Sequence, residues 1–154
     1  MPNLTPTALV SLTLALSAGL AFSATSGATP APKPVALKTN FIDHSQASLI
    51  DNAGAKAVLA ANISAKVLKL YPANKYAFVS QVEGGLTSAK ACVVTARVML
   101  LPVTSAMKAP LFRPEKTATA FDMQAGATAD QCKALALDKL KEATLSVVSA
   151  LVKT

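Results

Sequence analysis

The segment ACVVTARVMLL, residues 91–101, decides the fold. Its content of β-branched residues is typical of a strand. Side chains of a strand alternate between two faces, so every second residue shares a face. The face without charge is predicted to lie against helices, and the segment is then the middle strand of a sheet. That face holds Cys92, Val94, Ala96, Val98 and Leu100, and the other holds Val93, Thr95, Arg97, Met99 and Leu101.

Two more segments are predicted as strands on either side of this one. YAFVSQV, residues 76–82, runs into a polar turn at Gly85, and KTATAFDMQ, residues 116–124, follows a long connection. Both have the alternation and the β-branched content of strands. The order along the chain favours antiparallel pairing.

The last helix is predicted over CKALALDKLKEATLSVVSAL, residues 132–151. Thr128 and Gln131 have the spacing of a capping box, and Asp130 lies in the first turn, where the helix dipole favours an acid. One apolar stripe follows at helical spacing. It consists of Cys132, Ala136, Leu140, Ala143, Val147 and Ala150.

Cys92 and Cys132 are the only cysteines of the chain, and each lies on the face of its element that is predicted to be buried. In an exported protein, two cysteines predict one intramolecular disulfide. Redox pairs usually have C-x-x-C spacing, and a metal site needs more ligands than two cysteines and one histidine supply. Both alternatives are disfavoured.

An earlier helical signal begins near FIDHSQASLI, residues 41–50, where Asp43 and Gln46 have capping-box spacing. His44 would occupy the first helical position. An apolar stripe then continues to Pro72, which ends it, with Asn52 and Gly54 as candidate breaks. The stripe contains Leu59, Ala60, Ile63, Val67 and Leu70.

These elements predict an α+β fold in the order helix-strand-strand-strand-helix. The strands form a three-stranded antiparallel sheet, and two helices pack on one face of it. The length fits one domain. An alanine-rich core with no Trp, two Tyr and five Phe is expected to be thin, so the disulfide is expected to matter.

The start of the chain is predicted to be a signal peptide over residues 1–23. An apolar stretch at 8–22 precedes small residues suited to cleavage after Ser23, and no charged side chain occurs before Lys33. A retained membrane anchor is the alternative, but the stretch is shorter than the roughly 20 residues a span needs. Residues 24–40 are predicted to form an extended linker rich in Pro and Ala, and residues 41–154 the domain. The mature protein is expected in the periplasm or outside the cell.

The formal charge of +7 has two interpretations: it attracts anions, or it merely maintains solubility. Much of the excess lies on Lys90, Arg97, Lys108, Arg113 and Lys116, with Leu111 and Phe112 between them. The connection 102–115 has two interpretations: a lid whose Leu111 and Phe112 tuck into the core edge, which is favoured, or an element that binds an anionic membrane or a protein. The uncovered sheet face around Arg97, or an edge strand, is a second candidate contact for another chain.

No catalytic motif or metal-binding spacing is visible, so we expect no enzyme, cofactor or metal. His44 lacks a second histidine, and Glu83 and Asp122 are a weak candidate carboxylate pair across strands. The sequence favours an exported, non-catalytic binding or accessory protein of the cell envelope. The alternatives are a basic module for anionic polymers or lipids, and a small enzyme with an unrecognised site. The partner is expected to be a protein, a lipid headgroup or a polysaccharide, and not nucleic acid, which an exported protein rarely meets.

Overall fold

The computed structural model describes residues 38–106 and 108–152. The predicted signal peptide at 1–23 and most of the predicted linker at 24–40 lie outside the described residues. The described part forms seven elements in chain order. These are β1 (Phe41–Asp43), α1 (Asn52–Asn62), α2 (Ala65–Leu70), β2 (Tyr76–Leu86), β3 (Ala91–Pro102), β4 (Lys116–Ala125) and α3 (Ala129–Val152).

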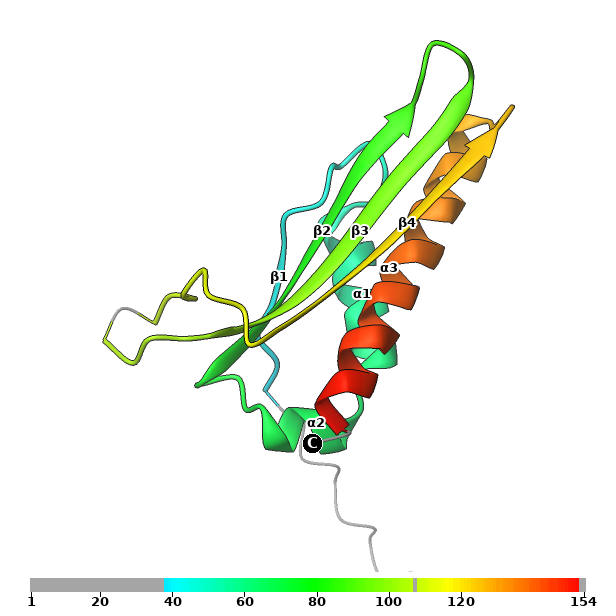
Figure 1. The fold of residues 1–154 in the computed structure, drawn as a ribbon. Coiled ribbons are helices and arrows are strands. Elements are labelled where there is room, and N and C mark those ends of the chain that lie inside the picture. Colours follow the sequence, from blue (N-terminus) through cyan, green and yellow to red (C-terminus); the bar gives the residue numbers. More distant parts are fainter. Residues whose placement is uncertain (1–37, 107, 153–154) are drawn as a thin grey trace, which may run out of the picture. The chain divides into compact units, whose positions relative to one another are not determined.

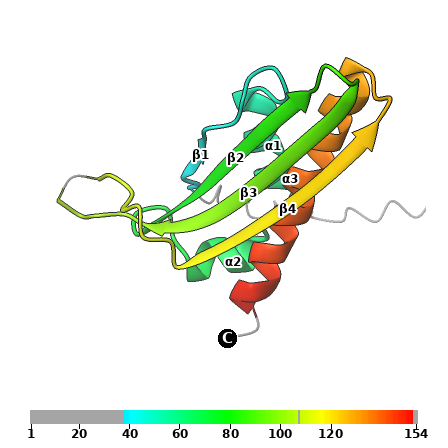
Figure 2. The ribbon, with the colours of Figure 1, turned by 45° about the horizontal axis from the view of Figure 1, so that its top comes forward.

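The strands form one mixed sheet in the order β1-β2-β3-β4. β1 runs parallel to β2, and the other two pairs are antiparallel. All three helices lie on one face of the sheet, and the other face is free of helices (Figures 1 and 2). The predicted α+β class is confirmed. The predicted three-stranded antiparallel sheet with two helices is wrong in detail, because the described chain has a fourth, parallel strand and three helices.

The first strand occupies the place where a helix start was predicted. Asp43 does not cap a helix: its Oδ1 accepts hydrogen bonds from Ser45 Oγ at 2.6 Å and from Ser80 Oγ at 2.8 Å. Gln46 Oε1 accepts from the backbone N–H of Gly84 at 3.1 Å. Both polar side chains therefore attach residues 43–46 to β2. The capping-box prediction is wrong here because the partners come from 37 and 38 residues further along the chain.

The helical segment begins later and breaks elsewhere than predicted. Asp51 caps α1 by accepting a hydrogen bond from the Gly54 N–H at 2.6 Å, so Asn52 and Gly54 start the helix and do not break it. The break comes at Ile63 and Ser64, both extended, and Ser64 Oγ caps α2. α2 ends at Leu70, ahead of Pro72.

The core lies between the sheet and the helices, on the predicted face of β3. Its five predicted residues, Cys92 to Leu100, are fully buried. The predicted stripe of α3 is buried with one exception: Ala150 is exposed and Leu151 takes its place. In the first stripe, Leu59, Ile63 and Val67 are buried, while Ala60 and Leu70 are exposed.

The predicted disulfide joins β3 to the first turn of α3. Cys92 and Cys132 are bonded, their Cα atoms are 5.5 Å apart, and both residues are buried. The predicted capping box of α3 is also confirmed. The Thr128 N–H donates to Gln131 Oε1 at 2.8 Å, and the Gln131 N–H donates to Thr128 Oγ1 at 3.2 Å.

Candidate functional site

The basic residues singled out in the sequence do not form one patch. Lys90 lies in the turn between β2 and β3, where its φ is 56°. Arg97 is exposed midway along β3 on the helix-free face. Lys108 and Arg113 belong to the connection between β3 and β4, and Lys116 is the first residue of β4, at the opposite end of the sheet from Lys90 (Figure 1). The length of β3 thus separates Lys90 from Lys108 and Arg113.

The connection between β3 and β4 is an exposed arm and not a lid. Val103 pairs with Pro110 in an isolated bridge, and the Leu111 N–H donates to the Pro102 carbonyl at 2.8 Å. These contacts fold the arm on itself beyond the end of the sheet (Figures 1 and 2). Phe112 is 83% exposed and Leu111 is 46% exposed. The favoured prediction that both tuck into the core edge is wrong, because the arm turns away from the helices.

Further lysines join the arm from distant parts of the sequence. A shallow depression is lined by Lys38 and Lys69 together with Ala73 and Asn74. A second depression shares Ala73 and Asn74 and is lined on its other side by Lys108. Three lysines from three segments therefore line two depressions that share Ala73 and Asn74, and we call these two depressions the hollow region.

We call this part of the surface the basic end. It is formed by α2, the segment before β1, the starts of β2 and β4, and the arm. The strand ladders place the strand ends side by side, and Lys69 of α2 and Lys108 of the arm line depressions that share Ala73 and Asn74. All of its charged residues are exposed. It consists of Lys38, Lys66, Lys69, Lys75, Lys108, Arg113 and Lys116, with Glu115 as its one acid among the described residues.

The basic end carries the whole positive excess of the described chain. Seven cations and one acid give it a formal charge of +6. The described residues together hold 13 cations and eight acids, a net +5. The remaining described surface is therefore −1. Among the described residues, every ion pair involves Lys139, so none includes a cation of the basic end.

Large apolar side chains are exposed among these cations. Leu70, the last residue of α2, is 56% exposed and follows Lys69 directly. Phe112 and Leu111 precede Arg113 on the arm. The basic end thus combines long cationic side chains with apolar groups that remain in water in the isolated domain.

The helix-free face of the sheet is a second open surface. The half of this face nearer the basic end is well packed, since Ala77, Val79 and Leu101 are buried. Towards the other end, Phe121 is 64% exposed and Met123 is 60% exposed, both on β4. This confirms an open, partly apolar area beside Arg97, and it lies along the edge strand.

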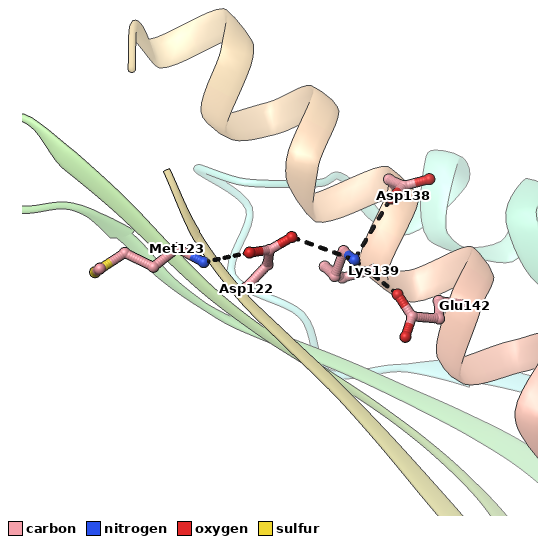
Figure 3. Close-up of polar contacts among 5 residues, drawn as sticks. All are labelled: Asp122, Met123, Asp138, Lys139 and Glu142. Carbon is pink, nitrogen blue, oxygen red and sulfur yellow. Dashed lines mark hydrogen bonds and ion pairs between the residues drawn. The ribbon is translucent and has the colours of Figure 1, made fainter. Parts of the chain in front are cut away.

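One ion-pair network links the helix-covered side of β4 to α3 (Figure 3). Lys139 Nζ lies 2.7 Å from Glu142 Oε2, 3.3 Å from Asp122 Oδ2 and 3.6 Å from Asp138 Oδ2. The Met123 N–H donates to Asp122 Oδ1 at 2.8 Å. This backbone hydrogen bond, followed by that of Lys139, lowers the pKa of Asp122. The hydrogen bond with Glu142, followed by that with Asp122, raises the pKa of Lys139.

The residues considered for chemistry do not come together. Glu83 and Asp122 lie on opposite faces of the sheet, because Glu83 pairs with Thr95 and Asp122 with Val94. The candidate carboxylate pair is therefore wrong. His44 is exposed just after β1, and its backbone N–H donates to the Ser80 carbonyl at 2.9 Å. Within residues 38–106 and 108–152, no group of three or more His, Cys, Asp or Glu could hold a metal ion.

Sequence reasoning found three of the seven cations of the basic end and missed Lys38, Lys66, Lys69 and Lys75. These four lie 33 or more residues before Lys108. The antiparallel pairing of β2 with β3 brings Lys75 and the end of α2 to the arm, and the parallel pairing of β1, which the sequence did not reveal, adds Lys38. A charge count over the segments flanking the predicted strands is the signal that could have found them.

No helix among the described residues has both the length and the apolar character needed to span a membrane. No protein-family model matches the chain, and no curated protein matches it. Among solved structures it is similar to the PelC dodecamer from Paraburkholderia phytofirmans, with 11% identity and a TM-score of 0.42, over 72% of this chain and 87% of that chain. So loose an overlap supports no statement about this chain's fold or function.

Proposed function

We propose that this chain is an exported, non-catalytic accessory protein of the cell envelope, and that its basic end holds it on an anionic membrane surface. The observation that carries the proposal is the separation of charge. A formal +6 lies at one end of the domain, while the rest of the described surface is −1. A potential of this kind both attracts an anionic surface and orients the domain towards it.

The magnitudes favour a membrane. Each Lys or Arg close to an anionic lipid surface contributes about 1 kcal/mol, so a few of the seven suffice for measurable binding. Phe112, Leu111 and Leu70 add apolar area that leaves water when it enters the apolar interior of a bilayer. An anionic polysaccharide offers charge without that interior, and therefore explains the cations but not the exposed apolar groups beside them.

The disulfide supports the exported location. Cys92 and Cys132 are buried and bonded, and such bonds persist where the surroundings are oxidising. A signal peptide at residues 1–23 belongs to the same proposal. Neither the membrane contact nor the export requires a catalytic group.

The first test is binding to vesicles by the exported protein. We expect it to sediment with vesicles containing anionic lipid and not with zwitterionic ones, and to be released by moderate salt. Replacing Lys69 and Lys108 together by Gln removes two cations that line the hollow region. At about 1 kcal/mol each, the expected loss of affinity is roughly 30-fold.

The matched control for this test is the double replacement Lys133→Gln and Lys141→Gln. It removes the same charge from exposed positions of α3 outside the basic end. It is expected to change binding by only a few-fold. Equal losses in the two double variants would mean that net charge alone attracts the protein, and the proposed contact would be wrong.

Phe112→Ser separates a membrane from an anionic polymer. If the basic end lies on lipid, this variant binds vesicles more weakly while its retention on an immobilised sulfated polysaccharide is unchanged. Unchanged vesicle binding would contradict the lipid contact and favour the polymer.

A further inference from the structure

Strand β4 presents a long free edge. In the part of the chain that the structure describes, β4 pairs only with β3, and its register is continuous from Lys116 to Ala125. Proteins usually protect such an edge by a short strand, a bulge, a proline or charges along it. β1, at the opposite edge, has three residues, whereas β4 has ten and contains neither proline nor glycine. A row of backbone groups is therefore available for pairing.

The ladder between β2 and β3 identifies which groups these are. The Val103 N–H donates to the Lys75 carbonyl at 2.7 Å, and the Thr87 N–H to the Ala91 carbonyl at 2.8 Å. Bonded and non-bonded pairs alternate in an antiparallel ladder, so the odd-numbered residues of β3 bond to β2 and the even-numbered ones to β4. The odd-numbered residues of β4 then direct their N–H and C=O groups to the free edge, with their side chains on the helix-free face.

One of these edge groups is already occupied. The Met123 N–H donates to Asp122 Oδ1, and Lys139 holds that carboxylate from α3 (Figure 3). Between the start of the strand and Met123, the free N–H groups are those of Thr117, Thr119 and Phe121. They are placed symmetrically about Thr119.

We propose that β4 pairs antiparallel with β4 of a second copy of this chain, about a twofold axis through Thr119. Thr117 then lies opposite Phe121 of the second copy, and Thr119 lies opposite Thr119 of the second copy. Each of the three free N–H groups of one copy donates to a carbonyl of the other copy, which makes six hydrogen bonds. The two sheets become one, and the helices of both copies lie on the same face.

The side chains of β4 fit this register. On the helix-covered face, Lys116 lies opposite Asp122 of the second copy, and the twofold axis repeats this pair of opposite charges. Ala118 lies opposite Ala120 of the second copy, so the two central side chains of the seam on this face are small. On the other face, Phe121 lies beside Thr117 of the second copy, an aromatic and β-branched combination that stabilises paired strands.

A shift of the axis loses these contacts. With the axis at Ala120, Lys116 would face Gln124 of the second copy in place of Asp122. The pairing would also need the Met123 N–H, which Asp122 already occupies. Of these two registers, only the one about Thr119 makes β4 complementary to itself. This identifies the occupant of the edge as a second copy. The proposal is independent of membrane binding.

The experiment uses single cysteines on β4. In a hydrogen-bonded antiparallel pair, opposite Cα atoms are about 5.5 Å apart, within disulfide range. Thr119→Cys is therefore expected to give a covalent dimer under mild oxidation. Thr117→Cys is the matched control on the same exposed face: the two copies of this position are roughly 14 Å apart, which is too far to bond. Intact mass checks that the Cys92–Cys132 bond is retained.

A second variant removes the edge hydrogen bonds without a crosslink. Thr119→Pro deletes an N–H that β3 does not use, so the domain is expected to fold while it stays monomeric. The unchanged protein is expected to gain mass in sedimentation as its concentration rises. Equal crosslinking of the two cysteine variants would overturn the proposal. So would a dimer that persists in Thr119→Pro, or an unchanged protein that remains monomeric up to near-millimolar concentration.

Discussion

At the scale of single residues, Gly84 is constrained by the strand beside it. Its φ is 129°, and a Cβ at this position would lie 2.0 Å from the carbonyl oxygen of Val93. Gly84→Ala is expected to lower the free energy of unfolding by roughly 2–6 kcal/mol, because backbone strain and overlap each cost about 1–3 kcal/mol. Urea denaturation measures the loss.

Gly85 is the matched control for this change. Its φ is 141°, but nothing lies within 4 Å of a Cβ built on it. Gly85→Ala therefore introduces backbone strain without the overlap, and it is expected to cost less than Gly84→Ala. An equal cost for the two variants would show that the Val93 carbonyl moves freely out of the way.

Asp122 and Lys139 give the stability a dependence on pH of opposite sign at the two extremes. The pKa of Asp122 is lowered in the folded domain, mainly by the Met123 N–H, so its contribution is present above the unfolded pKa and is lost as the pH falls through the folded pKa. The pKa of Lys139 is raised, so its contribution is lost only as the pH rises through that raised value.

The acid side of this dependence is testable by denaturation across pH. Asp122→Asn is expected to lower stability at neutral pH and to flatten the loss of stability on acidification. An unaltered acid limb in Asp122→Asn would contradict the assignment.

Capping-box spacing predicted hydrogen bonds correctly only where no distant strand competes for the two side chains. Thr128 and Gln131 form the predicted capping box because an uninterrupted helix follows them. Asp43 and Gln46 have the same spacing but bind Ser80 and Gly84. The pattern is equally good at both places, and a distant strand decides the second.

At the scale of elements, the disulfide clamps β3 to α3. Closing a loop across a sequence separation of 40 removes about 4 kcal/mol of unfolded-state freedom in the chain-entropy model. The double replacement of Cys92 and Cys132 by Ala is expected to lower the free energy of unfolding by about that amount. Denaturation of the unchanged protein with reductant should show a similar loss, while reductant should not affect the double variant. A loss well below this value would mean that the unfolded chain stays compact without the bond, so that the bond removes less of its freedom.

Elements with a clear period were predictable, and the interruptions were not. The three long strands begin at the predicted residues because their alternation and β-branched content are local properties. The break at Ser64 was missed because the stripe of Leu59, Ile63 and Val67 continues through it and remains buried on both sides. β1 was missed because three residues are too few to establish a period.

At the scale of the whole molecule, the surface was harder to predict than the core. The buried face of β3 and the position of the disulfide follow from alternation within single elements. The basic end depends on Lys38, Lys69 and Lys108, which come from three segments and meet only after the parallel crossover is formed. The total charge of +7 does not reveal that these three lysines lie at the same end of the domain.

The concentration of charge at one end also makes the domain an electric dipole directed along its strands. In the proposed β4 dimer, two such dipoles would lie side by side and antiparallel, so the two cationic tips would be about a strand length apart, which is several screening lengths at physiological salt. Their mutual repulsion would then be largely screened. A dimer of this kind would be two-headed, with each tip free to adhere to a different bilayer.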